Sequence, residues 1–282
     1  MQKPFYSIII PTYNRKIFLK KAVASVLAQS LEDFELIIID DGSTDSTRSF
    51  IDSLSDPRLK YIRQEHQGVS AARNNAIKAS RGCFIAFLDS DDWFKPQKLK
   101  ITHQYILKHP DYRIFHTEEI WYRNGILLAQ KAIHRKPDGY VFEQSLKLCC
   151  ISISAAAVKK ELFDAIGLFD ETMPACEDYD FWLRATARYP VKLIPEALTL
   201  KKGGHLDQLS KRYPCMDKFR IYAIKKILDS AALAPEQRKA AVRELARKCL
   251  IYIKGAEKRY KHKEIEYYKD IISTYNTQEE YD

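Results

Sequence analysis

Three short polar clusters in the first hundred residues hold side chains of the kinds that bind a cation or a phosphate. They are residues 11–14 (Pro-Thr-Tyr-Asn), 40–43 (Asp-Asp-Gly-Ser) and 89–92 (Asp-Ser-Asp-Asp). The three carboxylates of the last cluster repel one another unless a cation or a helix start offsets their charge. Mg²⁺ and Mn²⁺ prefer such oxygen ligands and bridge substrate phosphates. The cluster therefore indicates a divalent-metal site, although an acidic turn that caps a helix would have the same residues.

Each cluster follows an apolar run, and this predicts where the clusters lie. The expected strands are residues 6–10, 36–39, 61–62 and 83–88, and apolar residues at helical spacing mark 19–27 and 69–77. Strands and helices that alternate over short links predict a doubly wound α/β sheet, in which ligands bind outside the carboxyl ends of the strands. We therefore expect the three clusters to converge in space.

The remainder of the chain divides into a mixed part and a helical part. The mixed part holds an Asn-Gly hairpin signal at 124–125, strand candidates at 151–158, 191–194 and 197–200, and a helix over 179–189. From about Tyr213 the pattern is wholly helical, and Pro235 suits the first turn of a helix. We place the boundary near 208–213, which gives a sheet domain over 1–210 and a basic helical extension over 211–282.

The formal net charge of +9 is concentrated in that extension. From residue 211 onward, 17 lysine and arginine side chains stand against 11 aspartate and glutamate side chains. Such a surface suits an anionic membrane face or nucleic acid, but the extension has no recognisable nucleic-acid motif. We favour a helical cap that packs on the sheet domain with its charged face in water. Peripheral contact with the inner face of a membrane stays open as a hypothesis.

The shortness of the apolar runs predicts a cytoplasmic protein. No apolar run approaches the roughly 18 residues that span a bilayer. The run near the N-terminus is too short for a signal peptide. The six cysteines form no CxxC pair and no zinc-ligand spacing, so we expect all six to be structural. Cys83 and Cys149 lie in apolar stretches and are expected to be buried, reduced thiols.

Five segments together resemble the inverting family 2 of glycosyltransferases, in that family's order and spacing. They are residues 7–15, 39–45, 68–74, 87–92 and 176–184. The resemblance implies the GT-A fold, which is a Rossmann-like, doubly wound mixed sheet, here with a C-terminal helical extension. It implies transfer of a sugar from a nucleotide diphosphate, with UDP favoured, onto an acceptor hydroxyl. The acceptor is expected to be a glycan or a lipid-linked saccharide, and the cofactor Mg²⁺ or Mn²⁺.

The resemblance also implies a donor site at the first two strand ends. Tyr13 is expected to stack on the nucleotide base, with Pro11 and Thr12 beside it. Asp41 is expected to accept a hydrogen bond from the base edge, which suits the N3–H of uracil. Arg73 is expected to pair with the diphosphate or with the acidic cluster, because its planar fork of donors fits both.

The metal and the general base are implied in the same way. Asp89 is expected to contact the ribose or the donor sugar, and Asp91 to hold the metal. His205, in a Gly-Gly loop, is expected to meet the metal or the diphosphate. Asp178 is expected to be the general base. One departure from the family pattern lies near the donor, because relatives often carry Asn where His66 stands.

Several of these residues also admit plainer interpretations. Asp178 suits a helix N-terminus, where an acidic side chain meets the helix dipole favourably. Trp93 is a candidate for the acceptor cleft, whereas Trp182 suits packing in the core. A lone histidine in a loop is more often solvated than a ligand. Lys201 and Lys202 could touch phosphate, although they are also interpreted as surface lysines that need no function.

Two other classes of function compete with the transferase. A nucleotidyltransferase of similar fold would carry a glycine-rich phosphate loop after the first strand, where Pro-Thr-Tyr-Asn stands instead. A non-catalytic module that binds nucleic acid or a membrane surface through the basic extension would need no metal. The five segments favour the transferase over both.

Overall fold

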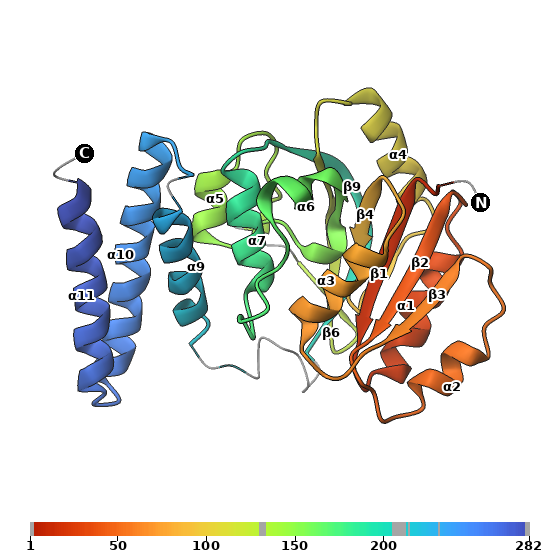
Figure 1. Ribbon diagram of the computed structural model, residues 1–282, viewed down its shortest axis with the longest axis horizontal. Helices are drawn as coiled ribbons and strands as arrows, with labels where there is room; N and C mark the ends of the chain where they lie inside the picture. The colour runs from red at the N-terminus through yellow and green to blue at the C-terminus, as the bar shows by residue number, and fades with distance from the viewer. Residues whose placement is uncertain (1–2, 130–133, 205–212, 214, 231, 280–282) are drawn as a thin grey trace.

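The computed structural model describes residues 3–129, 134–204, 213, 215–230 and 232–279 (Figure 1). Its strands are β1 (Tyr6–Thr12), β2 (Phe34–Asp40), β3 (Leu59–Arg63), β4 (Phe84–Phe87), β5 (Trp93–Phe94), β6 (Ile114–Arg123), β7 (Ile126–Leu128), β8 (Ala156–Lys159) and β9 (Val191–Gly203). Its α-helices are α1 (Lys16–Leu27), α2 (Thr47–Asp52), α3 (Val69–Ala79), α4 (Lys98–Lys108), α5 (Phe142–Lys147), α6 (Glu161–Ile166), α7 (Glu177–Thr186), α9 (Asp217–Asp229), α10 (Pro235–Glu257) and α11 (His262–Glu279).

The described strands form one mixed sheet in the order β3-β2-β1-β4-β8-β6-β9-β5, with β7 paired to β6. The first half is parallel, since β1 pairs in parallel with β2 and β4, and β2 with β3. Antiparallel β8 joins this half to β6. Strands β1 and β2 are buried along their whole length, which explains the apolar runs 8–10 and 36–39 within them.

Helices cover both faces of the sheet, as the alternation along β1 requires. Ile8 and Ile10 belong to one hydrophobic cluster with residues of α1 and α4. Ile9, which points to the opposite face, belongs to another cluster with residues of α3, α6 and α7. The predicted doubly wound α/β sheet is therefore confirmed. Its parallel strands end on the same edge, which brings the three polar clusters together.

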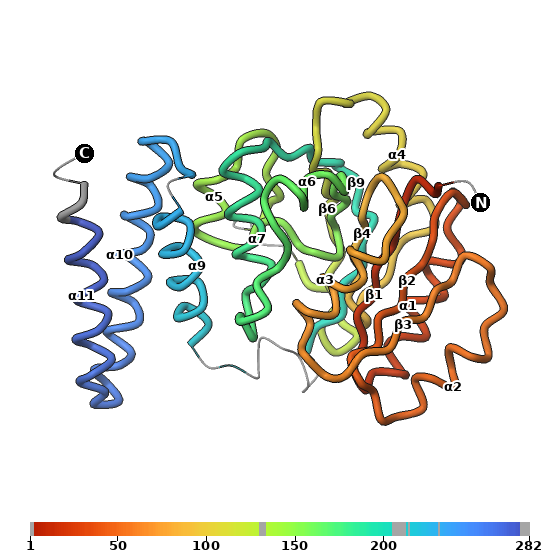
Figure 2. Tube along the Cα trace, viewed as in Figure 1, coloured from red at the N-terminus to blue at the C-terminus, as the bar shows by residue number. Residues whose placement is uncertain are grey.

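The C-terminal helices pack on the sheet-bearing part through α5 and α7. One hydrophobic cluster contains Leu146 of α5 and Leu183 of α7 together with Ile224 of α9, Leu245 of α10 and Ile271 of α11. Figures 1 and 2 show α9, α10 and α11 at the end of the molecule opposite β1–β3, with α11 outermost. Among the described residues no helix has both the length and the apolar character to cross a membrane. The division at residue 210 stays a prediction.

Two expected short strands, 191–194 and 197–200, are wrong as separate elements. They form one strand, β9, which continues to Gly203. Its pairing with β6 is irregular where Thr117 faces Ile194 and Glu118 faces Ala197. Pro195 lies in this interval and has no N–H to donate to the ladder, so the register shifts there without ending the strand.

Two other local expectations are corrected, and one is confirmed. The strand expected over 151–158 begins only at Ala156, because Ile153–Ala155 form a 3₁₀ turn. Cys83 precedes β4 and is exposed rather than buried. The hairpin at Asn124 and Gly125 is present between β6 and β7, with both residues at positive φ (51° and 83°), as its tight turn requires.

Candidate active site

The first two polar clusters are tied together at the ends of β1 and β2. The backbone N–H of Asp41 donates to the carbonyl of Thr12 at 2.9 Å, which extends the ladder one residue beyond the strands. The N–H of Asn14 donates to Ser43 Oγ, and the side-chain oxygen of Asn14 accepts from the N–H of Thr44. Asn14 adopts the left-handed conformation with φ of 53°, which asparagine tolerates better than most residues. Both clusters therefore form one rigid edge.

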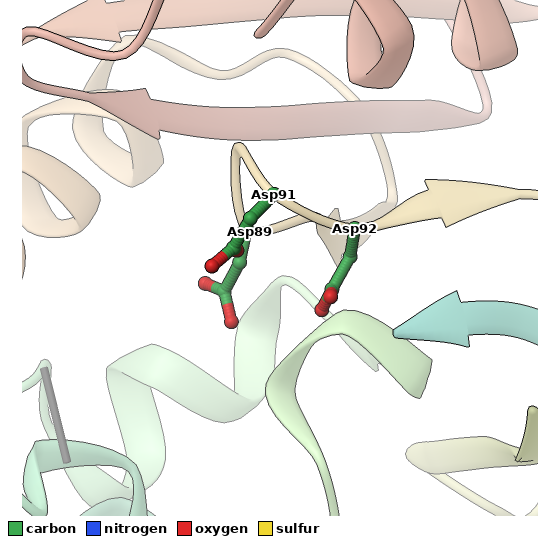
Figure 3. Close-up of side chains that lie close together, drawn as sticks. All are labelled: Asp89, Asp91 and Asp92. Atoms are coloured by element: carbon green, nitrogen blue, oxygen red, sulfur yellow. The ribbon is translucent and has the colours of Figure 1, made fainter. Parts of the chain in front are cut away.

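The third cluster forms an acidic triad in the turn between β4 and β5. One carboxylate oxygen from each of Asp89, Asp91 and Asp92 lies within 4.8 Å of the others. Figure 3 shows the carboxylates of Asp89 and Asp91 turned to the same side, with Asp92 beside them. Asp92 is buried, while Asp89 and Asp91 are partly accessible. This set of oxygen donors fits a hard divalent cation.

The hydroxyl of Ser154, which lies in the 3₁₀ turn, forms hydrogen bonds with two residues of the triad. Ser154 Oγ donates to Asp92 Oδ2 at 2.7 Å and accepts from the N–H of Asp89 at 3.1 Å. The turn that replaces the expected strand start thus places this serine against the carboxylates.

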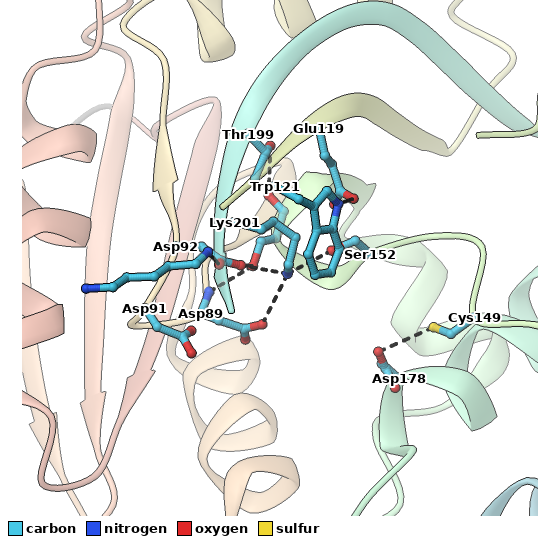
Figure 4. Close-up of polar contacts among 12 residues, drawn as sticks. Asp89, Asp91, Asp92, Glu119, Trp121, Cys149, Ser152, Asp178, Thr199 and Lys201 are labelled. Carbon is cyan, nitrogen blue, oxygen red and sulfur yellow. Dashed lines mark hydrogen bonds and ion pairs between the residues drawn. The ribbon is translucent and has the colours of Figure 1, made fainter. Parts of the chain in front are cut away.

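Lys201 supplies a cation inside the triad, so its interpretation as a surface lysine is wrong. Its Nζ lies 2.6 Å from Asp92 Oδ2, 3.9 Å from Asp89 Oδ2 and 3.0 Å from Ser152 Oγ (Figure 4). Only 13% of the side chain is exposed. Burial alone would lower the pKa of Lys201, but the carboxylates of Asp92, Asp89 and Glu119 raise it above its ordinary value. The ammonium group is therefore charged at neutral pH and offsets part of the negative charge.

Arg73 links the triad to α7. Its two terminal nitrogens contact Asp89 Oδ1 at 2.8 Å and Glu177 Oε1 at 2.5 Å. Burial opposes the charge of Arg73, but Asp89 and Glu177 hold its pKa above the ordinary value. Arg73 was expected to pair with the diphosphate or with the acidic cluster, and in the structure it pairs with the acidic cluster. Asp91 is engaged on its other side, where Arg15 Nη1 lies 3.1 Å from Asp91 Oδ2.

Asp41 is buried, and its carboxylate organises the loop at 64–68. Oδ1 accepts from Gln64 Nε2 at 2.7 Å and from the N–H of Gln67 at 2.9 Å. Oδ2 accepts from the N–H of Gly68 at 2.8 Å and lies 2.8 Å from His66 Nδ1. Its expected contact with a nucleotide base stays a prediction, and the structure adds a scaffolding role that sequence patterns did not indicate.

Asp178 lies in the first turn of α7, next to Glu177. Its Oδ2 accepts from the thiol of Cys149 at 3.4 Å, and its Oδ1 accepts from the N–H of Tyr179 at 2.8 Å (Figure 4). Burial, and secondarily the charge of Asp178, raise the pKa of the Cys149 thiol well above its ordinary value. The thiol therefore keeps its proton and stays a donor to the carboxylate. Asp178 thus stands at a helix N-terminus, as its plainer interpretation predicts, and its role as general base stays a prediction.

The two tryptophan candidates lie in different environments, and the histidine candidate is not described. Trp182 is 1% exposed and belongs to the core, as its plainer interpretation predicts. Trp93 stacks on Tyr122 with centroids 6.0 Å apart, and Lys21 Nζ lies 3.2 Å from its ring centroid. His205 lies outside the described residues, so its role stays a prediction.

The sequence interpretation missed a buried polar layer behind the triad. Glu119 of β6 forms an ion pair with Lys136 at 3.1 Å and accepts from Trp121 Nε1 at 3.1 Å. Lys98 of α4 donates to Thr199 Oγ1 at 2.8 Å, and burial lowers its pKa to about 7. The layer joins β6, α4, β9 and Lys136, which are far apart in the sequence and form no motif, so no local spacing could have singled them out.

The sheet is mixed and has helices on both faces. An acidic triad lies at its strand ends, beside a Glu-Asp pair on a helix. Together these features define a GT-A protein. A model of the family described as glycosyl transferase family 2 matches residues 7–167. The chain belongs to that family.

Relatives and solved structures agree with this assignment. The chain is 34% identical over 178 residues to the Escherichia coli UDP-Glc:alpha-D-GlcNAc-diphosphoundecaprenol beta-1,3-glucosyltransferase WfgD. This match covers 63% of this chain and 68% of WfgD. S. aureus TarS 1–349 in complex with UDP-GlcNAc has a TM-score of 0.71 at 21% identity, over 86% of this chain and 72% of that one. The mannosyltransferase PcManGT from Pyrobaculum calidifontis, in complex with GDP-Man and Mn²⁺, has a TM-score of 0.61 at 14% identity, over 99% and 84%. These two structures establish the shared fold.

The chain is shorter than some curated relatives. It spans 36% of the length of an uncharacterized glycosyltransferase of Rickettsia felis, to which it is 28% identical over 220 residues, or 74% of this chain.

Proposed function

We propose that the chain transfers a sugar from a UDP-sugar to a hydroxyl group of a glycan or lipid-linked saccharide, with inversion at the anomeric carbon. Membership of glycosyl transferase family 2 supports the reaction class. The complex of TarS with UDP-GlcNAc, a protein of the same fold, supports a UDP-linked donor. The lipid-linked acceptor rests on the name of WfgD, the E. coli relative.

One observation carries the proposal, and it is the position of Arg73. Its guanidinium contacts Asp89 of the triad and Glu177 of α7 at once. The proposed donor side and the helix that bears the proposed base are therefore joined by one buried cation. Such a connection holds two reacting groups in a fixed relative geometry, which is a large part of what an enzyme does for a two-substrate reaction.

The residues of the triad fit a divalent ion. They offer only oxygen ligands, with one atom from each within 4.8 Å, and PcManGT shares the fold and was solved with Mn²⁺. Asp91 would hold Mg²⁺ or Mn²⁺, with Asp89 directed to the ribose or donor sugar. When bound, the ion stabilises negative charge on the departing diphosphate. Lys201 reduces the repulsion among the carboxylates before an ion arrives.

Asp178 would act as the general base. Its carboxylate accepts the proton of the acceptor hydroxyl as that oxygen attacks the anomeric carbon, which is the ordinary task of such a group. Cys149 and the N–H of Tyr179 hold the carboxylate in one orientation. A single base is sufficient for in-line displacement with inversion, so no covalent sugar–protein intermediate is required.

The proposal is tested by thermal unfolding with UDP, GDP or dTDP, each in Mn²⁺ or EDTA. A ligand at a hundredfold excess over its Kd stabilises the native state by about 2.7 kcal/mol. We expect stabilisation by UDP in Mn²⁺ and its loss in EDTA. Release of UDP from UDP-glucose, with a synthetic GlcNAc-diphospholipid as acceptor, then tests transfer. Failure of every nucleotide to stabilise the protein would reject the proposal.

A further inference from the structure

The imidazole of His66 covers the proposed base site in two ways. Its ring stacks on Tyr13, with centroids 4.0 Å apart and planes inclined by 17°. Its Nδ1 lies 2.8 Å from Oδ2 of Asp41. Tyr13 is 40% exposed and the His66 side chain 49% exposed, so the stack lies open to solvent.

These two contacts are the ones expected of a nucleotide base. A pyrimidine is a flat heteroaromatic ring that would stack on Tyr13 and donate a ring N–H to Asp41. The imidazole is also a flat heteroaromatic ring, and it directs a ring nitrogen to the same carboxylate. A base cannot lie on the same face of Tyr13 and reach the same oxygen while the imidazole is there.

The loop does not depend on the imidazole for its shape. Asp41 also accepts from Gln64 Nε2 and from the N–H groups of Gln67 and Gly68. Three hydrogen bonds thus keep the loop and the carboxylate in place when the imidazole moves. The contacts of His66 are a stack at the surface and two polar contacts of Nδ1, with Oδ2 and with the backbone carbonyl of Asp41, and each is individually weak.

We propose that His66 occupies the place of the nucleotide base in the free protein, and that the base displaces the imidazole when the donor binds. The inference rests on the proposed function, because it takes Tyr13 and Asp41 as the base site. Its consequence is a competition between two rings. Only the fraction of molecules whose imidazole has moved away is ready to bind, and the apparent Kd rises in inverse proportion to that fraction.

Calorimetric titration with UDP in Mn²⁺ tests the competition. The proteins are the wild type, His66→Ala, and the control His262→Ala, which removes an exposed histidine at the start of α11. We expect the Kd for UDP to fall about three- to tenfold in His66→Ala, which matches the free energy of one aromatic stack. The control should bind as the wild type does. An unchanged or weaker affinity in His66→Ala would overturn the proposal and leave the transferase function standing.

A second variant and a second measurement guard against misfolding. His66→Asn keeps a donor for Asp41 but has no ring to stack, so it should also bind UDP more tightly than the wild type. In protein with ¹³C-labelled histidine, the His66 ring protons should be shifted by the ring current of Tyr13 and should move when UDP is added. Resonances that do not move at saturating UDP would overturn the displacement. Absence of UDP binding to all the proteins would instead reject the proposed function.

Discussion

Lys201 extends its ammonium group into the acidic triad, where its Nζ lies 2.6 Å from Oδ2 of Asp92. Asp92 is only 2% exposed, so its carboxylate has little water to stabilise a charge. Lys201 and the hydroxyl of Ser154 take the place of that water. The triad is therefore a paired site, in which Asp92 contacts Lys201, Asp89 contacts Arg73 and Asp91 contacts Arg15.

The first prediction concerns Lys201→Met, which removes this ammonium and keeps the length of the side chain. We expect the free energy of unfolding to fall by about 3–5 kcal/mol, because breaking a buried ion pair leaves an uncompensated charge. The control is Lys202→Met, since Lys202 Nζ lies 4.8 Å from the ring centroid of Phe18 on a partly exposed surface. Urea unfolding in EDTA measures both. Equal losses in the two variants would contradict the assigned role of Lys201.

The second prediction concerns Asp91→Ala, which removes the proposed metal ligand. The wild type should gain stability from UDP only when Mn²⁺ is present, and the variant should lose that gain. The control is Asp111→Ala, which removes an exposed carboxylate after α4. Thermal unfolding with UDP, with and without Mn²⁺, measures the effect. Full stabilisation of Asp91→Ala would show that the ion is held elsewhere.

The third prediction separates catalysis from donor binding through Asp178→Asn. The amide keeps the shape of the carboxylate but cannot accept the proton of the acceptor, so kcat should fall by about 10²–10⁴-fold. The Kd for UDP should stay within about twofold of the wild type, because the change leaves the donor side intact. Release of UDP in the acceptor assay gives kcat, and calorimetry gives Kd. A normal kcat would remove Asp178 from the role of base.

The fourth prediction concerns the reactivity of the cysteine thiols. Burial raises the pKa of Cys176 from 9.0 to about 12, which lowers its thiolate fraction at pH 8 by about a thousandfold. Burial and Asp178 raise the pKa of Cys149 as well. Iodoacetamide at pH 8 should therefore modify exposed Cys83 and spare Cys149 and Cys176 until the protein unfolds. Peptide mass spectrometry after timed labelling reads each site. Comparable labelling of all three would contradict the burial of Cys176 and the raised pKa of Cys149.

The parts of this protein that sequence patterns predicted are those set by local burial. Strands β1, β2 and β4 contain apolar runs because both faces of the sheet are covered, and the polar clusters follow those runs. Asn124 and Gly125 predicted their turn because few other residues adopt positive φ there. The family resemblance then supplied the expected roles of Tyr13 and Asp178, which no local pattern contains.

The parts that sequence patterns did not predict depend on contacts between distant segments. Lys201 begins a Lys-Lys pair after the strand-like run 197–200 and has the local sequence of a surface lysine, yet β9 places it against a turn from the first half of the chain. The stack of His66 on Tyr13 joins two loops in the same way. Cys149 meets Asp178 only because α5 and α7 share one core. Each relationship is set by tertiary packing, which local periodicity does not encode.

A partly buried ion-pair cluster connects the C-terminal helices to the segment around α7. Lys226 of α9 places Nζ 2.6 Å from Asp170 Oδ2 and 3.1 Å from Asp180 Oδ1. Asp180 belongs to α7, where it also pairs with Arg184 at 2.8 Å. Burial alone would raise the pKa of Asp170, but hydrogen bonds from Lys226 and Thr172 lower it to about 2. The extension is thus held by charge as well as by the shared hydrophobic cluster.

The last prediction is that Lys226→Met destabilises the protein in a pH-dependent way. A carboxylate whose pKa is lowered by folding contributes stability above its unfolded pKa, about 3.9, and loses that contribution as the pH falls through its folded pKa. The variant should therefore be less stable than the wild type by about 1–2 kcal/mol at pH 6–7, since Lys226 is partly exposed and solvent weakens the pair. The difference should shrink between pH 4 and pH 2, where Asp170 becomes protonated in both proteins.

The control is Lys225→Met, which changes the neighbouring lysine near Tyr267 and should show little pH dependence. Urea unfolding from pH 7 to pH 2 measures the difference. A loss of stability that is the same at every pH would mean that Lys226 acts through packing of its alkyl chain and not through its charge.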